Sequence, residues 1–128
     1  MELLFVYGTL LRGEDREGLV NQFDVREAVT SGRLWRVPAG YPALQFSMEG
    51  KPIAGEVLTL DGPSVLSVLD LYEGVRDGHY DRIRLPIQTD MGTEQAWAYV
   101  MSSAQLRRAG CVPLKVSDWR HYRRGRRA

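Results

Sequence analysis

The stretch that decides the fold is FVYGTLLRG, residues 5–13, near the start of a chain of 128 residues. The run from Glu2 to Tyr7 is apolar nearly throughout and is expected to form a buried strand. Gly8 interrupts this bulky run. A glycine at such a place either ends the strand at a turn or bulge, or bares backbone N–H groups for a small ligand. Other features of the sequence are needed to decide between these two interpretations.

The composition is that of an ordinary globular domain, with 44% hydrophobic and 26% charged residues. A chain of this length is expected to form one domain and to bury about two-thirds of its unfolded surface. It has no repeat, no signal-peptide pattern and no apolar run near the roughly 20 residues of a membrane span. The single cysteine, Cys111, excludes an internal disulfide and is expected to be an idle thiol. These features predict a cytoplasmic protein with no membrane contact.

Charge is placed unevenly along the chain. The last nine residues, RHYRRGRRA, contain five arginines, so removing these five charges from the net charge of +1 leaves −4 for residues 1–119. We therefore predict one domain over residues 1–119 and a basic tail over residues 120–128. The tail, from Arg120 to Arg127, could contact phosphate or an acidic partner. The acidic remainder makes nucleic-acid binding an improbable main function.

Alternating and apolar patterns predict further strands, separated by turn residues such as those of EGKP, residues 49–52. One clear helix is expected between Asp61 and Gly74. The other expected strands are residues 26–37 (one strand, or a bent pair around Gly32), Ala43–Met48, Ile53–Leu60, 81–89 and 94–101, with short helices near Leu19–Phe23, 102–110 and 117–124. Many strands around one main helix predict an α+β fold. Closure into a small mixed β-barrel, with the helix packed against it, would remove the exposed strand edges.

The expected helix has recognisable ends. Asp61 can cap its N-terminus, Pro63 suits the first turn, and Gly74 suits the position just past the end. Its buried stripe is predicted from helical spacing to be Val65, Leu66, Leu69 and Tyr72.

Glu73 stands at the end of this helix, where its charge faces the negative end of the helix dipole. Asp70, one turn earlier, adds a like charge. Such a placement should raise the pKa of Glu73, which suits a general acid/base near neutral pH. The alternative is a surface glutamate paired with Arg76 or Arg82. Tyr80 and Arg82 could also orient a carboxylate.

Other chemistry is poorly supported. His79 and His121 are the only histidines and lack partners at metal-ligand spacing, so no metal site is expected. No serine-hydrolase, P-loop or dinucleotide pattern is present, so we expect no cofactor. Tyr80, Tyr99 and Trp97 are expected in the core or in a pocket wall.

Five motifs occur in a recognisable order: FVYGTLLRG, GYPAL at residues 40–44, GEVLTL from residue 55, LDLYEG followed by YDR, and AWAYV. This series resembles the γ-glutamylcyclotransferase-like superfamily, which includes the γ-glutamylamine cyclotransferases and the AIG2-like proteins. The resemblance covers about residues 3–101, and SDWRHY resembles the short ending common in that superfamily. One departure is the acidic, glycine-rich RGEDREGL that follows YGTL, where many relatives continue with asparagine or histidine.

The resemblance implies a small mixed α/β barrel with a pocket beside the Tyr-Gly-Thr-Leu loop. It implies that this loop binds the γ-glutamyl group through its backbone amides and that Glu73 is the catalytic acid/base. The substrate-binding residues implied in this way are Tyr7, Gly8, Thr9, Leu10 and, less securely, Tyr80 and Tyr99.

The activity implied by the resemblance is release of 5-oxoproline from a γ-glutamyl amine or amide, a reaction classed with transferases or lyases. The small-molecule substrate would supply its own nucleophile, its α-amine. Two alternatives remain at this point: a non-catalytic metabolite-binding module of the same fold, and docking of the arginine tail on RNA or an acidic partner. The sequence leaves the leaving amine and the oligomeric state open.

Overall fold

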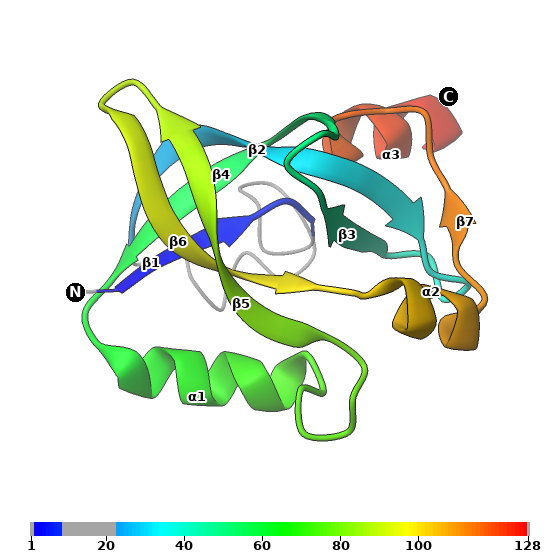
Figure 1. The fold of residues 1–128 in the computed structure, drawn as a ribbon, viewed down its shortest axis with the longest axis horizontal. Helices are drawn as coiled ribbons and strands as arrows, with labels where there is room; N and C mark the ends of the chain where they lie inside the picture. Colours follow the sequence, from blue (N-terminus) through cyan, green and yellow to red (C-terminus); the bar gives the residue numbers. More distant parts are fainter. Residues whose placement is uncertain (1, 9–22, 128) are drawn as a thin grey trace.

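Strands outnumber helices in the protein, and the helices lie around the sheet that the strands form (Figure 1). The structure is a computed structural model that describes residues 2–8 and 23–127, with side chains to residue 123. The elements in chain order are β1 (Glu2–Val6), β2 (Asp24–Arg36), β3 (Pro42–Phe46), β4 (Lys51–Leu60), α1 (Pro63–Tyr72), β5 (Asp81–Thr89), β6 (Gly92–Val100), α2 (Ser103–Ala109), β7 (Val112–Pro113) and α3 (Trp119–Arg127).

Five strands close into a mixed barrel in the order β2, β4, β1, β6 and β5, with β2 pairing back to β5. The pairing of β1 with β6 is parallel, whereas β1 pairs antiparallel with β4. The long strand β2 also pairs with β3 and β7, which extend the sheet beyond the barrel. The α+β fold with a small mixed barrel and one main helix against it, predicted from the sequence, is confirmed.

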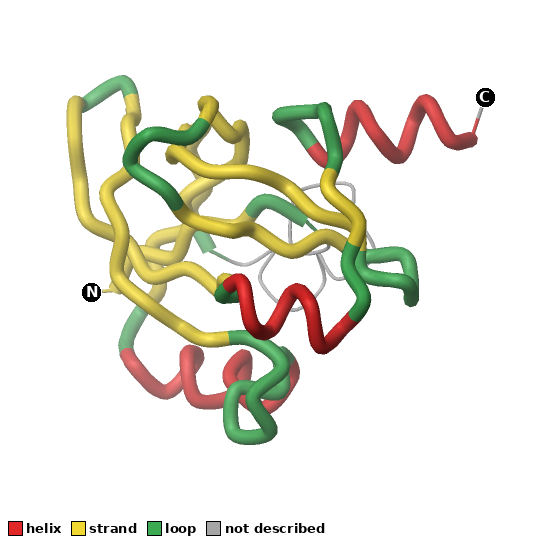
Figure 2. The backbone as a smooth tube through the Cα atoms, turned by 45° about the vertical axis from the view of Figure 1, so that its right-hand side comes forward, coloured by secondary structure: helices red, strands yellow, loops and turns green. Residues whose placement is uncertain are grey.

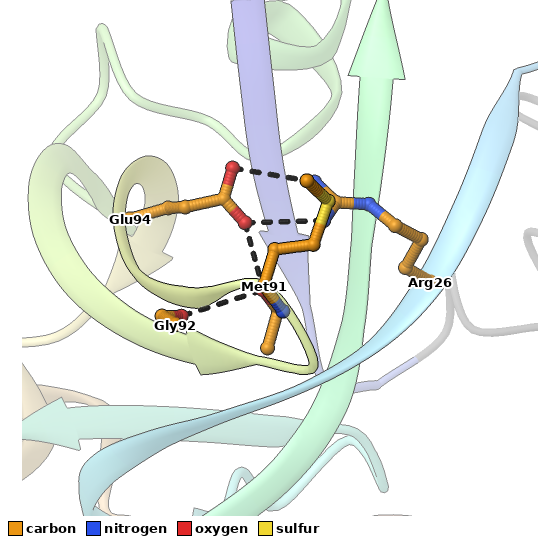
Figure 3. A network of polar contacts seen from close by, with 5 residues as sticks. Arg26, Met91, Gly92 and Glu94 are labelled. Atoms are coloured by element: carbon orange, nitrogen blue, oxygen red, sulfur yellow. Dashed lines mark hydrogen bonds and ion pairs between the residues drawn. The ribbon is translucent and has the colours of Figure 1, made fainter.

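The seam between β2 and β5 closes the barrel through few backbone contacts, with Val29 opposite Gln88. Side chains reinforce it. The Thr30 hydroxyl donates to the carbonyl oxygen of Pro86 at 2.8 Å. Close to the hairpin between β5 and β6, both guanidinium nitrogens of Arg26 donate to the Glu94 carboxylate, at 3.1 and 3.4 Å (Figure 3). Both donors come from β2, and they join this strand to β5 through Pro86 and to β6 through Glu94.

Alternation along each strand produces two apolar clusters on the two faces of the curved sheet. One fills the barrel interior, and the other lies between the sheet and helices α1 and α2. The interior cluster includes Phe5, Leu34, Ile53, Val57, Leu85 and Ile87, and the outer cluster includes Leu4, Leu58, Leu60, Leu66, Leu69 and Tyr99. Helix α1 therefore lies on the outside of the barrel, against β1 and its neighbours (Figure 1).

Two predicted details of α1 are wrong. Gly62, not Asp61, occupies the N-cap position, and no side chain caps the helix there. Tyr72 is half exposed at 50% instead of lying in the buried stripe, which contains Leu66 and Leu69. The helix repeats every 3.6 residues, so a residue three positions further on lies slightly to one side of the first. Two such steps, from Leu66 through Leu69 to Tyr72, therefore place Tyr72 well away from the buried side of Leu66. The residue seven after Leu66 returns to that line, and it is Glu73.

Strand β7 was not predicted, because two residues are too few to show a pattern. The helix expected near Leu19–Phe23 lies outside the described residues except for Phe23, which is not helical.

The C-terminal helix α3 lies at the opposite end of the molecule from α1 (Figure 2). Trp119 in its first turn is fully buried in the interior cluster and stacks on Tyr122, with ring centroids 5.1 Å apart. Arg120 reaches the fully buried carboxylate of Glu56 at 3.7 Å. The first turn of α3 is thus attached to the barrel, and the division between residues 119 and 120 stays a prediction.

Gly55 tests how tightly the barrel is packed around β1. A Cβ at this position would lie 2.6 Å from Phe5 Cζ and closer still to the Val6 carbonyl oxygen. We expect Gly55→Ala to lower the free energy of unfolding by roughly 1–3 kcal/mol or more, because neither neighbour has room to move. Gly62→Ala is the comparison variant: a Cβ there meets nothing within 4 Å, and only the smaller cost of a poorer N-cap for α1 is expected. Equal urea midpoints for the two variants would contradict this packing.

Candidate functional site

A pocket opens at the C-terminal end of β1. The described residues that line it are Phe5, Val6, Tyr7, Gly8, Tyr41, Pro42, Glu73, Tyr80 and Tyr99. They come from segments far apart in sequence: the end of β1, the start of β3, the end of α1, the residue before β5, and β6. Aromatic and apolar side chains form most of the wall, and Glu73 is the one carboxylate among these lining residues.

The end of α1 places Glu73 at the pocket. Glu73 is the C-cap residue, and its N–H still donates to the Leu69 carbonyl at 2.8 Å. Gly74 follows with φ +65°, a left-handed conformation that favours glycine. The N–H of Gly74 donates to Leu71 and that of Val75 donates to Asp70, which is the Schellman pattern of helix termination. This termination keeps Glu73 in helical register with Leu66, facing the barrel.

Four phenols line the pocket, and three of them donate their hydroxyl protons within the protein. Tyr7 donates to the carbonyl oxygen of Tyr99 at 2.5 Å, and Tyr80 donates to the carbonyl oxygen of Pro42 at 2.6 Å. The Tyr99 hydroxyl donates to the Asp70 carboxylate at 2.8 Å. Each of these three rings is therefore held by a hydrogen bond to another element.

The same phenols lie close to the charge of Glu73. Burial raises the pKa of Tyr7, Tyr80 and Tyr99 well above the usual value, and the negative charge of Glu73 raises each pKa further. The phenols stay protonated throughout the physiological range. They are poor proton donors for chemistry, which leaves Glu73 as the carboxylate suited to proton transfer in this wall.

Arg82 does not pair with Glu73, as the alternative interpretation of that residue expected, but with Asp70. The two side chains meet through two hydrogen bonds of 2.7 and 3.1 Å. Glu73 is half-buried at the pocket, so the surface-glutamate alternative is not favoured.

Of the predicted site residues, the structure brings Tyr7, Gly8, Glu73, Tyr80 and Tyr99 together around one pocket. Thr9 and Leu10 lie outside the described residues.

Sequence reasoning missed Tyr41 and Pro42, although both stand in the GYPAL motif that carried the resemblance. It also missed why residue 8 is a glycine. A Cβ at Gly8 would lie 2.5 Å from Pro42 Cγ, so the end of β1 and the start of β3 approach too closely for a side chain.

Three further features of the described residues concern chemistry outside the pocket. No group of three or more histidine, cysteine or acidic side chains there has the arrangement of a metal site. Cys111 is half-buried, and burial raises the pKa of its thiol, as expected for an unreactive cysteine. None of the helices among these residues is both long and apolar enough to cross a lipid bilayer.

The family model described as "Gamma-glutamyl cyclotransferase, AIG2-like" matches residues 4–121. The chain belongs to this family. The match runs from β1 into α3 and includes every described residue of the pocket. Membership supports γ-glutamyl cyclotransferase activity in general terms, and the pocket is the candidate active site.

Individual relatives agree with the family. Gamma-L-glutamyl-butirosin B gamma-glutamyl cyclotransferase of Niallia circulans is 30% identical over 129 residues, which cover 96% of this chain and 78% of that protein. Putative gamma-glutamylcyclotransferase YkqA of Bacillus subtilis is 29% identical over 123 residues, covering 94% of this chain but only 42% of YkqA.

Solved structures share the fold. The crystal structure of YkqA superposes with a TM-score of 0.73 at 30% identity, covering 94% of this chain and 40% of that one. A mouse AIG2-like protein superposes with a TM-score of 0.70 at 23% identity, covering 80% of this chain and 78% of that one. The barrel is thus the fold of the AIG2-like proteins.

The contact between Gly8 and Pro42 predicts how the pocket responds to a methyl group. Gly8→Ala should lower kcat/KM at least about tenfold, because the new Cβ displaces the end of β1 from the pocket. In a Pro42→Ala background the same change should cost much less, since only the Cβ of residue 42, 3.9 Å away, remains. A double-mutant cycle on kcat/KM measures the coupling. Independent, additive losses would contradict the steric explanation.

Proposed function

We propose that this protein releases 5-oxoproline from a γ-glutamyl amine or amide, with Glu73 as the general acid/base. The observation that carries the proposal is the shared pocket: Glu73 and Gly8 stand on its walls within a cyclotransferase fold. The Niallia circulans relative supports it, since its name describes removal of a γ-glutamyl group. For the substrate's leaving group we propose only its chemical class, an amine.

The proposed reaction is intramolecular. Glu73 takes a proton from the substrate's α-ammonium, and the free amine attacks the γ-carbonyl carbon of the same glutamyl unit. A carbon–nitrogen bond forms to close the five-membered ring, and the bond from that carbon to the leaving nitrogen breaks. Glu73 returns its proton to the leaving amine, and the ring nitrogen releases the extra proton of the attacking amine to solvent, which leaves the neutral lactam. Because both reactants are in one molecule, a pocket that holds the chain folded supplies several kcal/mol of the barrier, and the attack calls for neither a protein nucleophile nor a metal.

The backbone at the end of β1 is proposed to bind the negative charge of the substrate. The N–H groups of Gly8, Thr9 and Leu10 would donate to the α-carboxylate or to the oxyanion that forms at the γ-carbonyl. The described lining residues include no lysine or arginine, which favours backbone donors for this task. Bulky walls from Tyr41, Tyr80 and Tyr99 would exclude water and keep the glutamyl chain bent.

Glu73→Gln tests the proposed acid/base. The variant keeps the size and hydrogen-bonding capacity of the side chain but cannot accept a proton. We expect kcat to fall by about two to four orders of magnitude, the range for general acid/base groups. Glu49→Gln is the matched control, because it makes the same chemical change at an exposed turn away from the pocket.

The measurement is formation of 5-oxoproline by mass spectrometry, with substrate binding to each variant followed by calorimetry. Binding without turnover in Glu73→Gln is the expected result. Parent-like release of 5-oxoproline by this variant would show that Glu73 is not the base.

A substrate panel separates the enzyme from a binding module. γ-Glutamyl amines, γ-glutamyl dipeptides and γ-glutamyl derivatives of larger amino compounds should be compared at equal concentration with the parent protein. The proposal expects 5-oxoproline from at least one of these classes. Binding of several of them with no product from any would favour the non-catalytic alternative.

A further inference from the structure

We propose that Arg82 is a positioning residue that acts through Asp70 to hold Glu73 at the pocket wall. The inference rests on the proposed role of Glu73, and it assigns a function to a polar cluster that reaches the pocket lining through Tyr99. We call Asp70, Arg82 and Tyr99 the Asp70 network. Its members come from α1, β5 and β6, respectively.

The carboxylate of Asp70 is held from two strands at once. Arg82 Nε donates to Oδ1 at 2.7 Å and Arg82 Nη2 donates to Oδ2 at 3.1 Å, a two-bond arrangement that fixes orientation as well as distance. The Tyr99 hydroxyl donates to the same Oδ1 at 2.8 Å. Arg82 and Tyr99 face each other across the pairing of β5 with β6, so the barrel presents both donors on one face.

Asp70 is also part of the structure that ends α1. Its carbonyl oxygen accepts the N–H of Val75 at 3.0 Å and so helps to fold the chain back directly after Glu73. Asp70 and Glu73 are three residues apart, a spacing that puts two side chains on one helical face. A shift of Asp70 relative to the barrel would therefore carry Glu73 with it.

Neighbouring side chains hold Arg82 in position. Its guanidinium lies over the Trp97 ring, 4.4 Å from the ring centroid. The Trp97 Nε1–H donates to the Glu2 carboxylate at 2.8 Å, which fixes the ring against β1. The aromatic ring holds the guanidinium in place as well as Asp70 does. Little side-chain entropy is therefore lost when Arg82 binds Asp70 at the end of the helix.

Arg82 supplies a positive charge that the C-terminal end of α1 lacks. The last turn of this helix contains no basic residue, although it carries Asp70 and is followed by Glu73. Arg82 therefore supplies, from the barrel, the cation that a helix C-terminus favours. It also neutralises the carboxylate that lies one turn from Glu73.

The groups on neighbouring elements that lie near the charge of Glu73 include three neutral phenols. These phenols belong to Tyr7 at the end of β1, Tyr80 before β5 and Tyr99 on β6. The ring of His79 lies beside Gly74, next in the chain to Glu73. Loss of Arg82 would leave Asp70 as an uncompensated like charge, which makes ionisation of Glu73 harder.

The test is a double-mutant cycle of Arg82→Gln and Asp70→Asn, with 5-oxoproline release measured across pH. For Arg82→Gln we expect kcat to fall about tenfold or more, as for a displaced catalytic group. KM should change by no more than about twofold, and the acid limb of the kcat profile should move to higher pH. In the Asp70→Asn background, Arg82→Gln should add little, because its partner is already absent.

Two further variants separate positioning from support of the fold. Arg82→Lys keeps the charge and should restore the parent pH profile while recovering part of kcat. Arg84→Gln is the matched control: this neighbouring arginine also lies over Trp97, at 4.6 Å, but pairs with Glu2 instead of Asp70. It should lose less stability in thermal unfolding, because its side chain is more exposed than that of Arg82, and it should keep the parent kcat and pH profile.

Several outcomes would overturn the inference. Additive losses in the cycle, an unchanged kcat in Arg82→Gln, or an equal loss in Arg84→Gln would each do so. Glu73→Gln in the same assay distinguishes this failure from failure of the proposed function. If Glu73→Gln is inactive while Arg82→Gln turns over normally, only the positioning role is wrong; if Glu73→Gln retains the parent rate, the catalytic role itself is wrong.

Discussion

The pair between Asp70 and Arg82 is the contact by which the end of the main helix is fixed to the barrel. Apolar packing of Leu66 and Leu69 brings α1 to the sheet, but such packing has little directional preference. A guanidinium with two hydrogen bonds to one carboxylate does have a preferred orientation. Two acidic residues can therefore occupy the end of a helix, a placement that is unfavourable in a helix alone.

The elements of this fold were predictable where local patterns are strong. Strands β1, β4, β5 and β6 show apolar runs or alternation, and α1 is bounded by Pro63 and Gly74. The errors concerned features that depend on more than the local sequence: the buried side of α1 over two helical turns, and the pairing of β7. Tyr72 fits a step of three residues from Leu69, but the line of burial through Leu66 reaches Glu73 instead. Strand β7 forms because β2 offers a free edge at Trp35 and Arg36, which no local pattern at Val112 and Pro113 reveals.

The candidate site was predictable in part. Glu73 was singled out because a carboxylate stands at the wrong end of a helix, and Gly8 because it interrupts an apolar run. The resemblance indicated that both belong to one pocket. The role of Asp70 could not be predicted, because it depends on the register that puts Arg82 opposite Tyr99. The close approach of Pro42 to Gly8 likewise depends on how β3 meets the end of β1.

The position of β1 has a consequence for how the protein is made. This first strand lies between β4 and β6, and its parallel pairing with β6 joins Leu4 to Trp97. On the ribosome, β1 emerges long before either partner exists, and the barrel cannot close until β6 has been synthesised. Contacts over such long sequence separations slow folding, because the chain must close a large loop before it gains their stabilisation. The pocket at the end of β1 is accordingly among the last features to assemble during biosynthesis.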